Sequence, residues 1–176
     1  KEITMAKILT SIHGKLLGLL ANGALSTKGL TRDEDSIVNA TAATLTIKPQ
    51  THAGKTITLN RAGGIAVTLP AAVGQGDEYE FITGTTFTSS ATIKVANSSN
   101  VFVGFATFAN NAADTANVYE TAADSDTYTF DAAVSGLAGG RVKVRDVKLN
   151  GTTPVWLIEA IDAEDGTAAT PFSATV

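Results

Sequence analysis

The chain of 176 residues contains no cysteine, and this absence excludes disulfide bonds, zinc–thiolate sites and thiol nucleophiles. Charge is also scarce, because Asp, Glu, Lys and Arg together make up only 17% of the residues. The formal net charge of −4 differs from the basic excess of proteins that follow a phosphate backbone. No apolar run reaches the roughly 18 residues of a membrane span. We therefore expect no nucleic-acid partner and no membrane partner.

Signals for catalysis are equally few. His13 and His52 are the only histidines, and neither has a second imidazole at metal-ligand spacing. Serines are common, but the G-x-S-x-G motif of a hydrolase nucleophile is absent. We expect no enzymatic activity and no catalytic residue.

The acidic residues and one glycine pair are the remaining candidates for a ligand site. Calcium could bind Asp162, Glu164 and Asp165, or separately Asp124 and Asp126, but neither group follows the EF-hand pattern, so solvated turns are favoured. Gly74-Gln75-Gly76 is followed by a strand pattern rather than by the helix of a phosphate-binding loop, so a hairpin turn is favoured. The sequence thus predicts no metal and no cofactor.

Short runs of alternating apolar and polar residues dominate the chain from Ala43 onward. Between positions 52 and 104 they are separated by Gly, Pro, Asn and Ser, a pattern typical of consecutive antiparallel strands. Further runs surround Tyr128, Val142 and Trp156. Roughly ten short strands without a long helix predict an all-β fold, an antiparallel sandwich or barrel. The clearest runs in the central stretch are Thr56–Leu59, Ile65–Leu69, Tyr79–Thr83 and Thr92–Ala96.

Three segments are less regular. Residues 105–123 resemble a long surface loop. In residues 141–149 the apolar positions change parity near Arg145 and Asp146, which predicts either a bulge or a change of packing layer. Residues 162–176 are polar and are predicted to form an extended tail.

The N-terminal part divides from the rest at a polar stretch, so we expect an arm and linker at 1–36 and a β domain at 37–176. Gly14 and Gly18 interrupt the apolar segment, which disfavours both a signal peptide and a stable helix. Asn22-Gly23 between apolar flanks predicts a small hairpin in an extended arm. The arm either folds back onto its own domain or covers a groove on a neighbouring subunit. Candidate contacts with such a neighbour are its apolar residues Ile8, Leu9, Ile12, Leu16, Leu17, Leu19 and Leu20.

Four stretches occur in an order that resembles a known family. They are HAGKTITLNRAGGIAVTLPAAVGQGDEYEFITGT, TIKVANSSNVFVG, TAADSDTYTF and GTAATPFSATV. Together they resemble the head decoration, or cement, proteins of tailed bacteriophages. This resemblance implies a β-structured virion protein on the outer capsid surface that binds the major capsid protein, bridges capsomers as a homotrimer and stabilises the shell.

A tail-fibre or receptor-binding module of a phage is the alternative, because such modules are also β-rich, trimeric and free of cysteine. Copy number separates the two classes, since a decoration protein occurs in far more copies per virion than a fibre does. An enzyme such as a depolymerase would instead require carboxylates clustered in a groove.

Overall fold

The computed structural model describes residues 18–19, 25–26, 36–110, 113–166 and 169–176. The chain separates into two compact units, Lys1–Ser36 and Ile37–Val176. In the first unit, β1 (Gly18–Leu19) and β2 (Leu25–Ser26) pair antiparallel, with Leu19 opposite Leu25. This pairing confirms the predicted hairpin, whose turn residues lie outside the described part of the chain. No described helix has the length and apolar character needed to cross a membrane.

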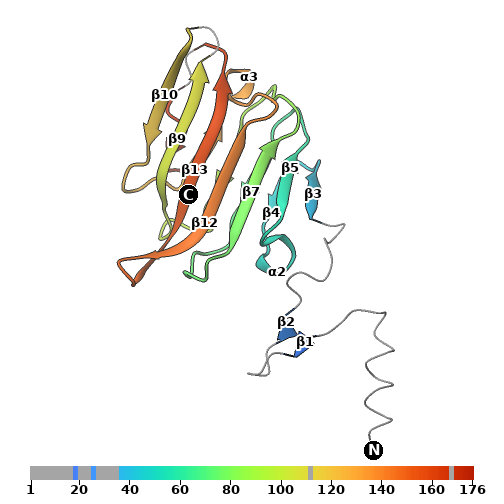
Figure 1. Ribbon diagram of the computed structural model, residues 1–176. Helices are drawn as coiled ribbons and strands as arrows, with labels where there is room; N and C mark the ends of the chain where they lie inside the picture. The colour runs from blue at the N-terminus through green and yellow to red at the C-terminus, as the bar shows by residue number, and fades with distance from the viewer. Residues whose placement is uncertain (1–17, 20–24, 27–35, 111–112, 167–168) are drawn as a thin grey trace, which may run out of the picture. The chain divides into compact units, whose positions relative to one another are not determined.

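The second unit is an all-β sandwich of two sheets, as predicted (Figure 1). One sheet has seven strands in the order β10-β9-β13-β12-β7-β5-β3, and the other has five in the order β14-β11-β8-β6-β4. The strands and helices are β3 (Ile37–Ala40), β4 (Thr44–Thr46), α2 (Pro49–His52), β5 (Thr56–Leu59), β6 (Ala66–Thr68), β7 (Glu78–Thr83), β8 (Ala91–Lys94), β9 (Phe102–Asn110), β10 (Thr115–Glu120), β11 (Thr127–Phe130), α3 (Ala132–Ser135), β12 (Arg141–Leu149), β13 (Thr153–Glu164) and β14 (Phe172–Ser173).

The first half of the sandwich departs from the predicted antiparallel order. Successive strands alternate between the sheets, so β3, β5 and β7 lie in one sheet while β4, β6 and β8 lie in the other. Neighbours within each sheet are therefore parallel. The prediction of consecutive antiparallel strands was wrong here because a period of two shows that one face is buried but not which strand lies alongside.

The second half is built mainly from hairpins. Strands β9 and β10 pair antiparallel from Phe105 opposite Glu120 to Asn110 opposite Thr115, so the loop predicted at 105–123 is wrong. The alternation in β9 was hidden because apolar residues occupy both of its faces. Strands β12 and β13 pair without interruption from Arg141 opposite Ile161 to Leu149 opposite Thr153, which excludes a bulge. The apparent parity change arises because the inward position after Val144 is taken by a buried aspartate, Asp146.

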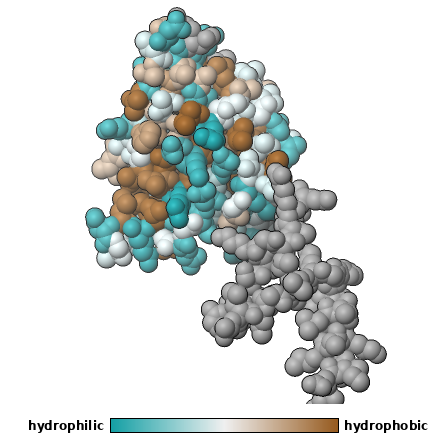
Figure 2. All heavy atoms as spheres, viewed as in Figure 1, coloured by the Kyte–Doolittle hydropathy of each residue, from teal (hydrophilic) through white to brown (hydrophobic). Residues whose placement is uncertain are grey.

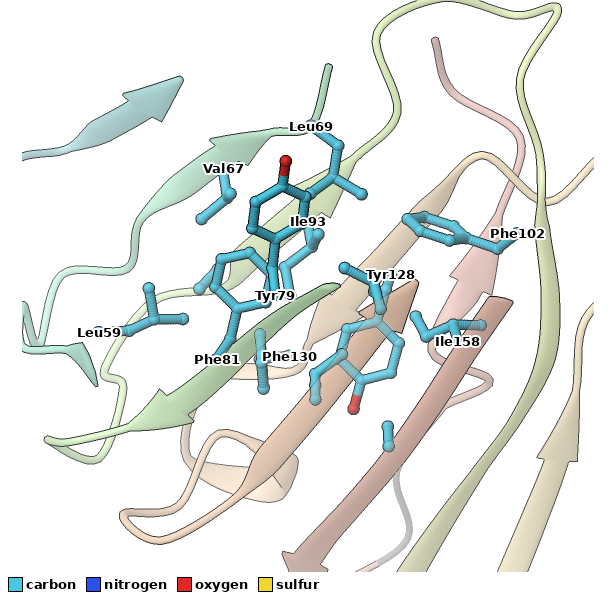
Figure 3. Packing of buried hydrophobic residues seen from close by; sticks show 14 of the residues in the cluster. Leu59, Val67, Leu69, Tyr79, Phe81, Ile93, Phe102, Tyr128, Phe130 and Ile158 are labelled. Atoms are coloured by element: carbon cyan, nitrogen blue, oxygen red, sulfur yellow. The ribbon is translucent and has the colours of Figure 1, made fainter. Parts of the chain in front are cut away.

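The core lies between the two sheets and is rich in aromatic side chains (Figure 3). Tyr79 and Trp156 have ring centroids 5.7 Å apart, and the indole N–H of Trp156 donates to the carbonyl oxygen of Pro70 at 3.2 Å. Tyr128 contacts Phe130 at 5.0 Å and Phe172 at 5.6 Å. Each such pair adds about 0.5–1.5 kcal/mol beyond the area that it buries. This interior holds both sheets as a rigid platform for their outer faces.

The predicted extended tail is partly strand. β13 continues through Glu164, and β14 adds an edge to the five-stranded sheet by pairing with β11. The last residues are held by Asp126, whose carboxylate accepts hydrogen bonds from the backbone N–H groups of Thr175 (2.8 Å) and Val176 (3.1 Å). Contacts with the sandwich thus hold the C-terminal segment in place, and its polar composition did not reveal those contacts.

Candidate assembly surface

The seven-stranded sheet exposes an apolar strip on the face that points away from the core. The register places its members on one face, because Phe105 lies opposite Glu159 and Glu120, Leu157 lies opposite Val103, and both Ile161 and Val118 lie opposite Thr107. We call this set the outer apolar strip: Val103, Phe105, Val118, Leu157 and Ile161.

The strip is exposed in the isolated chain. Phe105 remains 44% exposed and Val118 63% exposed, and Leu157 and Ile161 are similarly open. Figure 2 shows apolar side chains gathered over β9, β10 and β13 on this face. Glu120 and Glu159 lie beside Phe105 on the same face, so the strip is apolar surface with acidic neighbours, and exposed apolar patches rimmed by polar residues mark sites of association.

A hollow of about 510 Å³ lies at one end of the strip. Its lining comes from the β9–β10 hairpin and includes Phe105, Val118 and Gly104. A side chain at Gly104 would collide with the carbonyl oxygen of Ile158, so the glycine allows β9 and β13 to approach closely here. Glu120 and Thr121 also line the hollow.

A charged band borders the strip on β7 and β12. Lys143 and Glu78 form an ion pair at 3.0 Å, and Arg141 and Glu80 form another at 3.6 Å. These side chains are about half exposed, so each pair contributes at most about 1 kcal/mol to stability. The band keeps its part of the face polar and limits the apolar surface to β9, β10 and β13.

Of the two histidines, only His52 lies within the described ranges. His52 lies in α2, and its Nδ1 accepts a local hydrogen bond from the N–H of Lys48 at 3.0 Å. Within the described ranges, no group of three or more His, Asp or Glu side chains could hold a metal ion.

Of the two acidic groups predicted to lie in solvated turns, Asp124 and Asp165 are exposed in a turn and a bend, as predicted, but the prediction was wrong for the other three residues. Asp162 and Glu164 lie on the inner face of β13, and Asp126 is also buried. Glu164 accepts hydrogen bonds from the side-chain amides of Asn110 (3.0 Å) and Asn117. A carboxylate can occupy an inward strand position when neighbouring amides complete its hydrogen bonds, and sequence spacing does not reveal those partners.

The Gly74-Gln75-Gly76 segment binds an anion, but that anion is a side chain of the protein itself. Asp146 accepts hydrogen bonds from the backbone N–H groups of Val73 (3.1 Å), Gly74 (2.7 Å) and Gln75 (3.0 Å). The segment connects β6 in one sheet to β7 in the other, so it is not the predicted hairpin turn. Its N–H groups are already occupied by a structural carboxylate.

Most of the residues predicted as contacts are not among the described residues. Ile8, Leu9, Ile12, Leu16, Leu17 and Leu20 are outside the described residues, and of Leu19 only the backbone is described. Sequence reasoning missed the outer apolar strip because it assigned residues 105–123 to a loop. The available signal was the presence of apolar residues at both parities in β9 and β13, which is typical of strands covered on both faces.

No protein-family model matches the chain, and no curated protein matches it.

Proposed function

We propose that the chain is a structural virion protein that binds the outer surface of a tailed-phage capsid and stabilises the shell by bridging capsomers. The outer apolar strip carries this proposal, because it offers an association surface on a rigid β body that has no metal cluster among its described residues. The family resemblance of four stretches of the sequence supports the same class. The partners are the major capsid protein and two further copies of the chain in a homotrimer.

The proposed mechanism is multivalent binding. Fully burying one large apolar side chain is worth roughly 1.5–3 kcal/mol, so a half-exposed Phe105 or Leu157 contributes about 1 kcal/mol. Such contacts are weak singly, but a trimer presents three sets at once and raises their effective concentration. A protein that binds only the mature lattice then shifts the assembly equilibrium toward the closed shell. The N-terminal apolar residues supply a second set of contacts.

The test is binding of the full chain to purified capsids without decoration protein, measured by co-sedimentation. Wild-type protein is expected to saturate the capsids, whereas F105E/V118E is expected to lose at least tenfold in affinity, since two charges would have to be buried. The matched control is V73E, which places a negative charge at an exposed apolar residue outside the strip. Equal binding by F105E/V118E and V73E would remove the strip from the proposal.

Deletion of residues 1–30 tests the second set of contacts. The shortened protein is expected to keep its β circular dichroism spectrum and to lose capsid binding. Failure of the wild-type chain to bind any capsid would contradict the function itself. A count of tens of copies or fewer per virion would then favour the alternative, a tail-fibre or receptor-binding module.

A further inference from the structure

Strand β10 is an open edge of the seven-stranded sheet. It pairs with β9 on one side, and no described strand pairs with its other side (Figure 1). The other edges of the two sheets are β3, β14 and β4. These strands have four, two and three residues, whereas β10 has six. Among the described strands, β10 therefore offers the longest edge for a further strand.

β10 also lacks the features by which proteins protect an edge strand, which include lysine, proline and bulges. Pro171 directly precedes β14, and Lys48 and Pro49 closely follow β4. The sequence of β10, TANVYE, contains neither proline nor lysine, and its register with β9 is unbroken from Thr115 to Glu120. A long edge without such protection is a template for pairing with another chain.

The backbone groups that β10 presents at this edge follow from its pairing with β9. Thr121 donates its N–H to the carbonyl oxygen of Gly104 at 3.1 Å, directly after the pair of Glu120 with Phe105. Hydrogen-bonded pairs alternate along an antiparallel ladder. Every second residue before Thr121 therefore directs its N–H and C=O groups toward β9, and the residues between them direct theirs toward the open edge. These edge residues are Ala116, Val118 and Glu120.

The side chains of the edge residues lie on the outer face of the sheet. All three are exposed, and Val118 is 63% exposed. Val118 lies opposite Thr107 and Glu120 lies opposite Phe105, so this edge is continuous with the outer apolar strip. A strand that is added at β10 therefore extends the face that carries the strip and does not cover it.

The inner side chains of β10 hold the strand in place. The ring centroids of Tyr119 and Phe108 lie 5.3 Å apart, and the side-chain amide of Asn117 donates a hydrogen bond to the carboxylate of Glu164. These contacts fix the course of β10 without using the backbone groups at the open edge. The edge is thus preorganised, which lowers the cost of ordering it when a partner strand binds.

The residues along the edge fit a second copy of the same strand. Two β10 strands can pair antiparallel about a two-fold axis when a residue whose backbone groups face the edge lies at the centre. With Glu120 at the centre, two like charges would lie directly opposite each other, which is unfavourable. With Ala116 at the centre, the pairing would include Asp114, whose φ of 52° departs from strand geometry. Val118 at the centre avoids both problems and places two apolar side chains together.

The neighbouring positions are compatible with this register. Glu120 then lies opposite Ala116 of the second copy, so no like charges meet on the outer face. On the inner face Asn117 lies opposite Tyr119 of the second copy. The two-fold axis is perpendicular to the sheet, so both outer faces point to the same side. The two outer apolar strips therefore lie next to each other on one surface.

We propose that β10 is a homotypic pairing edge at which two copies of the chain join their seven-stranded sheets into one continuous sheet, with Val118 on the two-fold axis. A two-fold contact cannot lie within a threefold trimer, so in the proposed shell it joins copies from neighbouring trimers. That placement rests on the proposed function. The pairing itself rests on the geometry of β10 alone.

The first test is the mass of the full chain in solution, measured by sedimentation equilibrium without capsids. Wild-type protein is expected to contain an even number of copies, and V118P is expected to contain half that number, with association weakened at least tenfold. Proline at position 118 removes an N–H group that faces the open edge and keeps those that face β9, so the fold is retained. Equal masses for wild type and V118P would overturn the proposal.

V118K provides a second variant that leaves the backbone unchanged. It places two like charges directly opposite each other on the axis and is also expected to halve the number of copies. I37K is the matched control, because Ile37 is 62% exposed and lies on β3, the other edge of the same sheet. It is expected to keep the wild-type mass. A loss of mass in I37K equal to that in V118K would show that the two edges pair head to tail, and homotypic pairing would be wrong.

Disulfide crosslinking tests the register. The chain contains no cysteine, so V118C supplies a single thiol. In the proposed pair the two Cα atoms at position 118 lie about 5.5 Å apart, a separation that a disulfide bond spans. Under copper-catalysed air oxidation, V118C is expected to form covalent pairs at least tenfold faster than I37C.

A mixed disulfide between V118C and mass-tagged I37C as the main product would contradict the homotypic register. None of these experiments contains capsids, so their outcome is separate from that of the capsid-binding test. Loss of the pairing would leave the proposed function standing, and failure to bind capsids would leave the pairing standing.

Discussion

Two buried aspartates lie on neighbouring strands of one sheet but at different ends of the sandwich, and their hydrogen-bond partners differ. Asp146 on β12 accepts hydrogen bonds from three successive backbone N–H groups of the segment that crosses between the sheets. Asp162 on β13 receives only the N–H of its own neighbour and has one oxygen without a partner among the described residues. The two buried carboxylates therefore differ in the number of backbone N–H donors that the fold supplies to them.

The most damaging change expected at the Asp146 end is D146A. It removes the acceptor of three N–H groups and is expected to reduce the free energy of unfolding by about 3 kcal/mol, since each unsatisfied buried donor costs roughly 1–3 kcal/mol and water can reach part of this segment. Urea denaturation at pH 7 measures the loss. D146N keeps one acceptor oxygen and should lose about half as much. A loss below about 1 kcal/mol for D146A would show that the crossing segment keeps its conformation without the carboxylate of Asp146.

A smaller loss is expected at the other end from G140A. The added methyl group collides with the Asp162 carboxylate, and relieving the collision should cost about 2 kcal/mol, as overpacking of a core does. The same substitution in a D162A background should cost much less, because the carboxylate is gone. A double-mutant cycle by urea denaturation measures this coupling. Equal costs in the two backgrounds would contradict the close contact.

The smallest effect is expected from D126N, and it tests whether donors lower the pKa of a buried carboxyl. Burial would raise the pKa of Asp126, but the N–H groups of Thr175 and Val176, the hydroxyl of Thr127 and the charge of Lys94 together lower it. The contribution of Asp126 to the free energy of unfolding is thus present above its ordinary pKa. That contribution is lost as the pH falls through the lower pKa of the folded state.

D126N is therefore expected to be about 1 kcal/mol less stable than wild type at pH 7 and to approach it near pH 2, measured by urea denaturation. Burial raises the pKa of Asp162 to about 7, whereas the pKa of Asp126 is lowered, so the two carboxyls shift stability with pH in opposite directions. A loss that does not change with pH would show that the tail is held by packing instead.

Much of the sandwich could be predicted from local pattern. Thr56–Leu59 alternates strictly and Tyr79–Thr83 alternates as far as Phe81, and each lies in a strand with one buried face. The Asn22-Gly23 hairpin could also be predicted, because the pairing of Leu19 with Leu25 depends only on residues between them. Local pattern failed where apolar residues occupy both faces, as around Phe105, since no single period then stands out.

The candidate surface was predictable only in part, for a related reason. Phe105, Val118 and Leu157 come from three strands, and their meeting on one face depends on strand order and register. The apolar N-terminal residues, in contrast, are adjacent in the chain and could be named as contacts from composition alone. Their role as contacts stays a prediction.

The sequence by itself determined an all-β body with half-buried strands and excluded thiol chemistry, because strand periodicity and the absence of cysteine are local properties. Only the tertiary structure decided which sheet each strand joins, where apolar side chains remain exposed, and which buried carboxylate receives backbone donors. Those outcomes depend on contacts between residues such as Asp146 and Gly74, which are 72 positions apart. A local pattern of residue types does not reveal a contact between residues so far apart in the sequence. Hydrogen bonding and burial are determined only when the two sheets pack against each other.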